Sequence, residues 1–187
     1  MAIATGSQFW TSRVLANNPT ALTGSNNDNW TVSTGSVGSA NGDFWRITNG
    51  NLRQTHSSNS LTIMAAFKFS TAPSNGDPLL YLDNGSHKVE VRSKGAMDKL
   101  DLVGASTVTT HDLDLDMQEM DAVPILLRLT LASDGTANLY MREITEDDDG
   151  AQHYLSVTGA SGSTAEAKWG NTSGVVDWSC VYFTHHG

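Results

Sequence analysis

Hydrophobic and polar residues alternate along most of this chain with a period of two. Between positions 61 and 69, every odd position is apolar, whereas Thr62 and Lys68 occupy even positions. Similar alternation occurs in residues 87–92, 125–131 and 137–141. Successive residues of a β-strand point to opposite faces of its sheet. The pattern therefore predicts strands that bury one face and expose the other.

Short polar turns separate these alternating segments. Asn84-Gly85 and Asp134-Gly135 supply residues that tolerate positive φ, as tight hairpins require. The nearest helical candidate, residues 117–123, stops at Pro124. Strands at roughly 8–12-residue spacing with such turns predict an all-β fold of two antiparallel sheets. Residues 29–187 are expected to form this one β-sandwich domain, and residues 1–28 an irregular N-terminal segment that contacts a neighbouring molecule.

The last predicted strand covers residues 175–183. Strict alternation places Trp178 on the same face as Val176, so Trp178 is expected in the core. One face of this strand is expected to carry Val176, Trp178, Cys180 and Tyr182. The other face is expected to carry Val181 and Phe183.

Charge and composition narrow the classes of partner. The 187 residues have a formal net charge of -9, which argues against nucleic acid and against anionic membrane surfaces. The single cysteine, Cys180, excludes an intramolecular disulfide. No run is long and apolar enough to cross a membrane, and residues 1–6 lack the basic and apolar regions of a signal peptide.

The order of the segments resembles the laminin G-like, or concanavalin A-like, jelly-roll superfamily. The resemblance spans residues 29–183, and its pieces are 29–32 (NWTV), 42–47 (GDFWRI), 60–69, 79–91, 124–141 and 176–182. It implies two curved antiparallel sheets. Members include lectins, carbohydrate-binding modules, glucanases, adhesion domains and many viral structural proteins, so the fold alone does not decide the function.

Catalysis is not supported by the residues that the resemblance singles out. Glucanases of this superfamily carry Glu-x-Asp-x-x-Glu on one strand, which brings two carboxylates close enough for retaining hydrolysis. The nearest match here is Glu119, Asp121 and then Pro124 in place of the third carboxylate. We therefore expect a protein that is not an enzyme.

Two acidic segments raise the question of a cation. Asp112, Asp114 and Asp116 alternate along one strand face, which suggests either a Ca²⁺ site or a solvated face neutralised by a cross-strand Lys or Arg. The second interpretation is favoured, and residues 143–150 are interpreted as a solvated turn. Ca²⁺ stays an alternative without assigned ligands, and no other cofactor is expected. The six histidines are expected to lie scattered on the surface.

Aromatic side chains are the remaining candidates for ligand binding. Among the tryptophans, Trp169 is the best candidate for an exposed ring because its segment is polar, and one of Phe44 and Trp45 is expected to point outward. Aromatic planes can stack on sugars when polar groups lie beside them. The predicted ligand-binding residues are Trp45, Asp43, Asn49, Asp83, Asn84 and Trp169.

Two functions follow from these observations. The first is a non-enzymatic structural module of a virion, as a capsid decoration or cement protein or a tail or attachment component. Its partners would be other virion proteins and copies of itself, assembled in the host cytoplasm. The alternative is a carbohydrate-binding, lectin-like module with a glycan as its partner.

Overall fold

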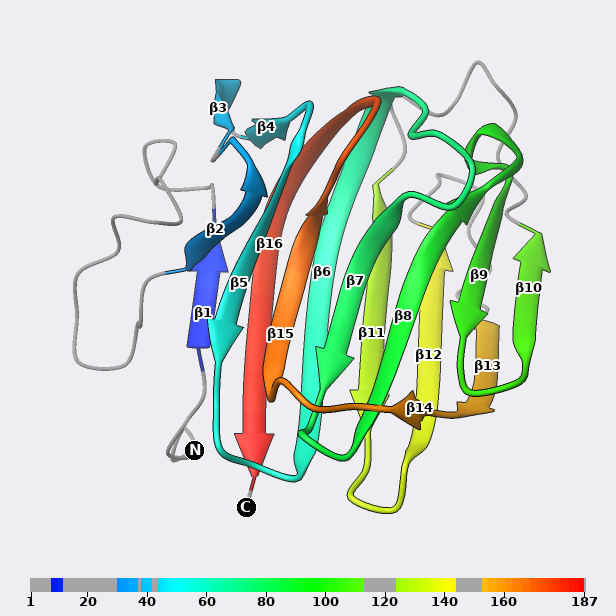
Figure 1. Ribbon diagram of the computed structural model, residues 1–187. Helices are drawn as coiled ribbons and strands as arrows, with labels where there is room; N and C mark the ends of the chain where they lie inside the picture. Colours follow the sequence, from blue (N-terminus) through cyan, green and yellow to red (C-terminus); the bar gives the residue numbers. More distant parts are fainter. Residues whose placement is uncertain are drawn as a thin grey trace.

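The computed structural model describes residues 8–11, 30–36, 38–41, 44–112, 124–143 and 153–186. These residues form two antiparallel sheets that pack face to face (Figure 1), which confirms the predicted all-β sandwich. Sheet A contains, in spatial order, β13 (His153–Thr158), β12 (Thr136–Glu143), β11 (Ile125–Leu131), β6 (Ser60–Thr71), β16 (Val175–His186), β4 (Phe44–Ile47) and β3 (Ser39–Asn41), and β1 (Gln8–Thr11) also pairs with β16.

Sheet B lies in front of sheet A in Figure 1. Its strands are, in spatial order, β10 (Val108–Asp112), β9 (Lys99–Val103), β8 (His87–Lys94), β7 (Pro78–Asp83), β15 (Glu166–Asn171), β5 (Gly50–Thr55) and β2 (Thr31–Gly35), and β14 (Ala160–Ser161) pairs with β8. A single 3₁₀ turn, η1 (Gly95–Met97), follows β8 in the described part of the chain. In these described residues no helix is long and apolar enough to cross a membrane.

The core lies between the sheets and is built by the alternation seen in the sequence. Every odd position of β6 from residue 61 to residue 69 is buried, and β6 pairs with both β11 and β16. Trp30, Trp169 and Trp178 pack together in the middle, with ring centroids 5.9 Å apart for the first two and 5.2 Å apart for the last two. Trp178 is fully buried, as predicted.

A β-bulge changes which residues of the last strand face the core. The register of β16 against β6 shifts between Trp178 and Cys180. An extra residue in one strand moves every later side chain to the opposite face. Val181 and Phe183 are therefore fully buried, whereas Cys180 is only half-buried. The strict alternation predicted for residues 175–183 is wrong beyond this point.

The predicted hairpin between β7 and β8 is present. Gly85 has a φ of 87°, a conformation that L side chains rarely adopt, and Asn84 N donates to His87 O at 2.9 Å. Four strands were not expected, and two of them, β3 and β14, are only two or three residues long. The other two are β15 and β1. β15 runs through the polar stretch around Trp169, and β1 lies within the segment 1–28, where it pairs with β16 of the same chain.

Candidate ligand-binding site

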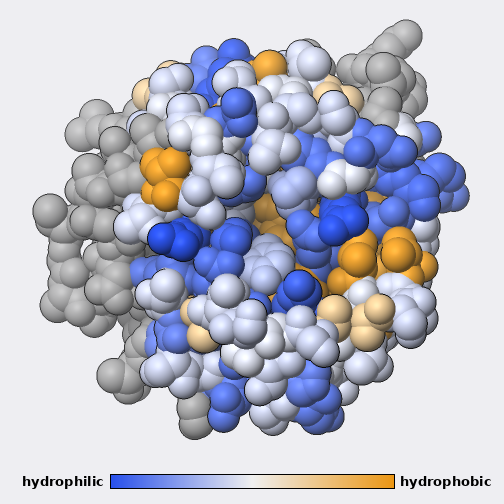
Figure 2. Space-filling view, in the orientation of Figure 1, coloured by the Kyte–Doolittle hydropathy of each residue, from blue (hydrophilic) through white to orange (hydrophobic). Residues whose placement is uncertain are grey.

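A hollow of about 200 Å³ lies on the outer face of sheet B. Figure 2 shows this face as largely hydrophilic, with hydrophobic surface at the bottom of a depression near its middle. The residues lining the hollow are Ser33, Thr34, Asn51, Pro78, Leu79, Leu80, Tyr81, Glu90 and Lys168. They come from β2, β5, β7, β8 and β15, so the hollow is built mainly on paired strands, which hold its shape.

Register places the main polar groups of the hollow in one row across the sheet. Tyr81 lies directly opposite Lys168 on one side and Glu90 on the other. The Lys168 Nζ atom lies 4.9 Å from the centroid of the Tyr81 ring, and Arg53 continues the row on β5. Alternate positions of these strands face outward, which is why a tyrosine between buried leucines reaches this surface.

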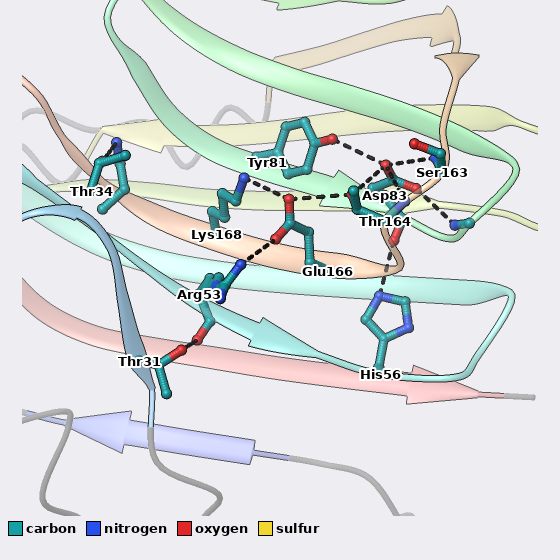
Figure 3. A network of polar contacts seen from close by, with 12 residues as sticks. Thr31, Thr34, Arg53, His56, Tyr81, Asp83, Ser163, Thr164, Glu166 and Lys168 are labelled. Atoms are coloured by element: carbon teal, nitrogen blue, oxygen red, sulfur yellow. Dashed lines mark hydrogen bonds and ion pairs between the residues drawn. The ribbon is translucent and has the colours of Figure 1, made fainter.

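The charges around the hollow neutralise one another. Lys168 Nζ lies 2.6 Å from Glu166 Oε1, and Arg53 Nη1 lies 3.9 Å from the other oxygen of the same carboxylate (Figure 3). On the opposite wall, Arg92 Nε donates to Glu90 Oε2 at 2.7 Å. The hollow therefore offers both donors and acceptors without a strong net field.

Beside the hollow, Asp83 ties the end of β7 to the loop before β15. Its carboxylate accepts hydrogen bonds from the Tyr81 hydroxyl, from Gly85 N, from the backbone N–H groups of Ser163 and Thr164 and from Thr164 Oγ1, at 2.8–3.2 Å (Figure 3). Burial acts to raise the pKa of Asp83, but these hydrogen bonds outweigh it and lower the pKa to about 2. Burial, together with the Asp83 carboxylate, raises the pKa of Tyr81 above its ordinary value. This carboxylate is therefore a structural anchor in this molecule.

The structure distributes the predicted ligand-binding residues over distant places. Asp83 and Asn84 are buried at the β7–β8 turn, where Asn84 Nδ2 donates to Asn59 O and Ala132 O. Asn49 is exposed before β5, near the opposite end of the sandwich, and Asp43 lies outside the described residues. These residues do not form one cluster, and a ligand-binding role for any of them stays a prediction.

The two tryptophans of that set lie in the interior. Trp169 is 0% exposed and Trp45 is 5% exposed, so neither ring offers a face to a sugar. The expected exposure of Trp169 is wrong because β15 is a central strand, on which Trp169 faces inward while Lys168 faces outward. Phe44 is the partly exposed member of its pair, with Lys68 Nζ 4.6 Å from its ring centroid.

Histidines and carboxylates are grouped differently from the prediction. The rings of His111 and His153 lie 4.2 Å apart and those of His56 and His185 lie 5.8 Å apart, so four of the six are paired and not scattered. Asp112 has the predicted cross-strand partner, because Lys99 Nζ lies 2.7 Å from its Oδ1. Asp114, Asp116 and residues 144–150 lie outside the described residues. In the part that is described, no group of three or more His, Cys, Asp or Glu residues could hold a metal ion.

Sequence signals for the hollow were weak. Tyr81, Glu90 and Lys168 lie on three different strands, and β15 itself was not predicted. The alternation in β8 did place Glu90 on the solvent side. Only the register of the sheet reveals that these three side chains lie next to one another.

Comparisons with known proteins find the fold but no close relative. No family model and no curated protein sequence matches the chain. Lectin I-B4 from Griffonia simplicifolia, in its metal-free form, is similar over 84% of this chain and 92% of the lectin, with a TM-score of 0.53 and 9% identity. The fold is a lectin-like jelly roll.

Two further structures with this lectin-like jelly roll come from larger proteins. Tailspike protein 2 of Escherichia coli O157:H7 bacteriophage CAB120 has a TM-score of 0.52 and 12% identity, over 77% of this chain and 23% of the tailspike. Trypanosoma rangeli sialidase, in complex with the inhibitor DANA, has a TM-score of 0.50 and 14% identity, over 77% of this chain and 25% of the sialidase. The chain thus matches only about a quarter of each. At 9–14% identity these likenesses show the fold of the chain and do not decide its function.

Proposed function

We propose that this protein is a non-enzymatic carbohydrate-binding module whose ligand lies in the hollow on sheet B. The observation that carries the proposal is the chemistry of the lining. The floor is apolar (Pro78, Leu79, Leu80), while Lys168, Glu90 and Asn51 supply donors and acceptors around it. A sugar has the same division, because its ring carries apolar C–H faces and its hydroxyl groups both donate and accept.

The volume of the hollow limits how much of a glycan it can hold. About 200 Å³ is below the ~300–1,000 Å³ of pockets that enclose drug-sized molecules. The hollow suits one sugar unit, with the rest of a glycan extending over the sheet. The Tyr81 hydroxyl is held by Asp83, which preorganises its ring at the edge of the site.

The lining also favours binding over hydrolysis. Retaining and inverting glycosidases use a pair of carboxyl groups on either side of the scissile bond. Glu90 is the single carboxylate among the lining residues, and it is paired with Arg92. We expect no release of reducing sugar from glycans that the protein retains.

A glycan array and two charge variants test this proposal. The array identifies the sugars that the protein retains, and Lys168→Met and Glu90→Gln should each lower the affinity for them about tenfold, since a hydrogen bond to a charged group contributes ~1.5–3 kcal/mol. Lys88→Met is the matched control, because Lys88 is exposed on the same face but lies outside the hollow. A protein that retains no glycan, or variants that bind as well as wild type, would contradict the proposal.

A second candidate is the structural virion module, and the edges of sheet B favour it. In the described part of the chain, β2 and β10 are the terminal strands of this sheet, and each carries an exposed valine, Val32 and Val108. Figure 2 shows hydrophobic surface toward both sides of this face. Edge strands with apolar side chains can pair with a neighbouring protein.

Virion assembly has its own test. Purified particles should contain the chain in stoichiometric amount by mass spectrometry, and the isolated protein should show a mass above that of a monomer by light scattering. Val108→Lys should reduce the assembly and leave glycan retention unchanged. A strictly monomeric protein that is absent from particles would rule out this candidate without affecting the first.

A further inference from the structure

A second group of side chains that is suited to ligand binding lies on the outer face of sheet A, on the side opposite the hollow. Tyr154, Tyr140, Arg128 and Met64 are directly opposite one another on β13, β12, β11 and β6, and form one row. The Arg128 Cζ atom lies 3.9 Å from the centroid of the Tyr140 ring, and the Tyr140 and Tyr154 centroids are 5.1 Å apart. We call Tyr154, Tyr140 and Arg128 the sheet-A row.

Arg128 differs from other arginines of the molecule in its partners. Arg46, Arg53 and Arg92 each have a carboxylate oxygen within 4.0 Å. Arg128 makes no ion pair with any residue that the structure describes, and its Nε is enclosed without a hydrogen-bond partner. Among the described residues, the partner of the guanidinium charge is therefore the face of the Tyr140 ring, and an aromatic ring is a weak partner for a cation.

Within the described part of the chain, the positions around Arg128 supply no anion for it. The outward positions that flank it on its own and the adjacent strands are Leu126, Thr130, Asn138, Arg142, Thr62 and Ala66. None of these six is a carboxylate, so no acidic side chain of the described residues flanks Arg128 at these positions. A planar guanidinium matches a carboxylate through two parallel hydrogen bonds. Because Nε is enclosed, such a ligand would approach the two terminal nitrogens.

The chemistry beside Arg128 points to a sugar as the carrier of that carboxylate. Tyr154 is 54% exposed, and its hydroxyl donates to Asn138 Oδ1 at 2.6 Å, which holds the ring in place. A preorganised, exposed ring suits the C–H face of a sugar, and the Asn138 amide nitrogen is left as a donor. A protein partner would need about 800 Å² of surface per side, yet Tyr154 is the one large exposed apolar side chain described on this face.

From this arrangement we propose that the sheet-A row binds oligosaccharides that carry a carboxylate, with Arg128 holding the carboxylate and Tyr154 stacking on a neighbouring sugar ring. Strands 4.7–4.9 Å apart put these two side chains about 10 Å from each other across β12, roughly the length of two sugar units. The site is independent of the hollow, because the two lie on opposite outer faces of the sandwich.

Titration calorimetry with tetragalacturonate and with its methyl ester tests the role of the charge, since the two differ only in their carboxylates. Wild type should bind the acid at least tenfold more tightly than the ester, and added salt should reduce the difference. Arg128→Gln should lower the affinity for the acid about tenfold and leave the ester unaffected, while Tyr154→Ala should weaken both. Arg128→Lys should fall between wild type and Arg128→Gln, because it keeps the charge and loses the planar fork.

Controls separate this site from the hollow and from a fold defect. Lys88→Gln removes one positive charge from the opposite face and should change neither affinity. Thermal unfolding of Arg128→Gln and Tyr154→Ala establishes that the variants are folded. Equal binding of acid and ester, no binding of either, or loss in Lys88→Gln equal to that in Arg128→Gln would overturn the proposal. Binding of a glutamate-rich peptide, with the same dependence on Arg128 and without binding of tetragalacturonate, would replace the sugar by a protein partner.

Discussion

Each sheet carries a basic side chain beside a tyrosine ring on its outer face, Lys168 on sheet B and Arg128 on sheet A, but the two differ in their charged partners. On sheet B, Lys168 is paired with Glu166 of the same strand and Lys94 with Asp101 of the adjacent strand, so each of these positive charges has a carboxylate partner. On sheet A, Arg128 rests on an aromatic ring and has no described carboxylate partner. A group of neutralised charges selects ligands through shape and hydrogen bonding, whereas a cation without a carboxylate partner selects them through charge. One sandwich can therefore present two surfaces with different ligand preferences.

The largest effect is expected at Asp83, a buried carboxylate at the end of β7 that accepts hydrogen bonds from several donors. Asp83→Asn should lower the free energy of unfolding by about 3 kcal/mol, because an amide cannot accept all the donors that now converge on the carboxylate. Urea unfolding at pH 7 measures the loss, with Asp98→Asn, at an exposed aspartate, as the control.

The pKa of Asp83 adds a pH test of the same anchor. Since its pKa is about 2 in the folded state, below the ordinary value of 3.8, the stabilisation is complete above pH 3.8 and is lost as the pH falls from there through about 2. The stability difference between wild type and Asp83→Asn should shrink over that interval. A difference that stays constant from pH 4 to pH 2 would contradict the anchor role.

A smaller loss of stability is expected at Arg46 of sheet A, and a still smaller one at Arg128 of the same sheet. Arg46 makes two hydrogen bonds of 2.7 Å to Asp177, whose side chain is 4% exposed, and these raise the pKa of Arg46. Arg46→Met leaves that buried carboxylate short of a partner and should cost about 2 kcal/mol. Arg128→Met loses only the ring contact and should cost about 0.5–1 kcal/mol. Comparable losses in the two variants, measured by thermal and urea unfolding, would mean that Arg128 has a charged partner after all.

The smallest effect concerns His56, which follows β5 of sheet B and whose ring centroid lies 5.8 Å from that of His185 on β16 of sheet A. Ser58 N donates to His56 Nδ1 at 3.2 Å, and His56 Nε2 lies 3.0 Å from Asp83 O. Burial lowers the pKa of His56 below 6.5, despite the hydrogen bond to the Asp83 carbonyl. The unfolded chain then binds a proton first as the pH falls, so the free energy of unfolding should decrease from pH 7 to pH 5.

His56→Gln provides the comparison for that slope. Removing the imidazole should flatten the decrease between pH 7 and pH 5 in urea unfolding. His186→Gln, at the exposed end of β16, should retain the wild-type slope. If wild type and His56→Gln lost stability in parallel, another group would be responsible for the pH dependence.

The sequence predicts the sandwich well because alternation records which side of each strand is buried. The prediction is wrong where a strand departs from strict alternation or where the polarity of its neighbours misrepresents burial. The bulge at Ser179 adds one residue to β16 without any signal in composition, and it exchanges the faces of Cys180 and Val181. Trp169 looked exposed because its neighbours are polar, yet Lys168 and Gly170 occupy the outward positions of a central strand.

The candidate sites were less predictable because register creates them. Tyr81 and Lys168 are 87 positions apart in the sequence, and Arg128 and Tyr154 are 26 apart. Neither pair belongs to a local motif, so only the pairing of β7 with β15, and of β11 with β12 and β13, brings them together. The turn next to Asp83 was predictable from the sequence because Asn84-Gly85 is typical of a tight hairpin, but the hydrogen bonds of the Asp83 carboxylate to residues 163 and 164 were not.

The pairing of β1 with β16 also determines how the molecule would respond to mechanical load. Gln8 lies opposite Phe183 and Thr11 opposite Cys180, so β1 begins at the same end of the sheet at which β16 finishes. A force that separates the two ends would peel β1 away and break its hydrogen bonds one after another. Strands loaded in this unzipping direction yield at far lower force than strands sheared along their length. If both ends of the domain are tethered, β1 is therefore the first element to detach, while the hollow and the sheet-A row keep their shape.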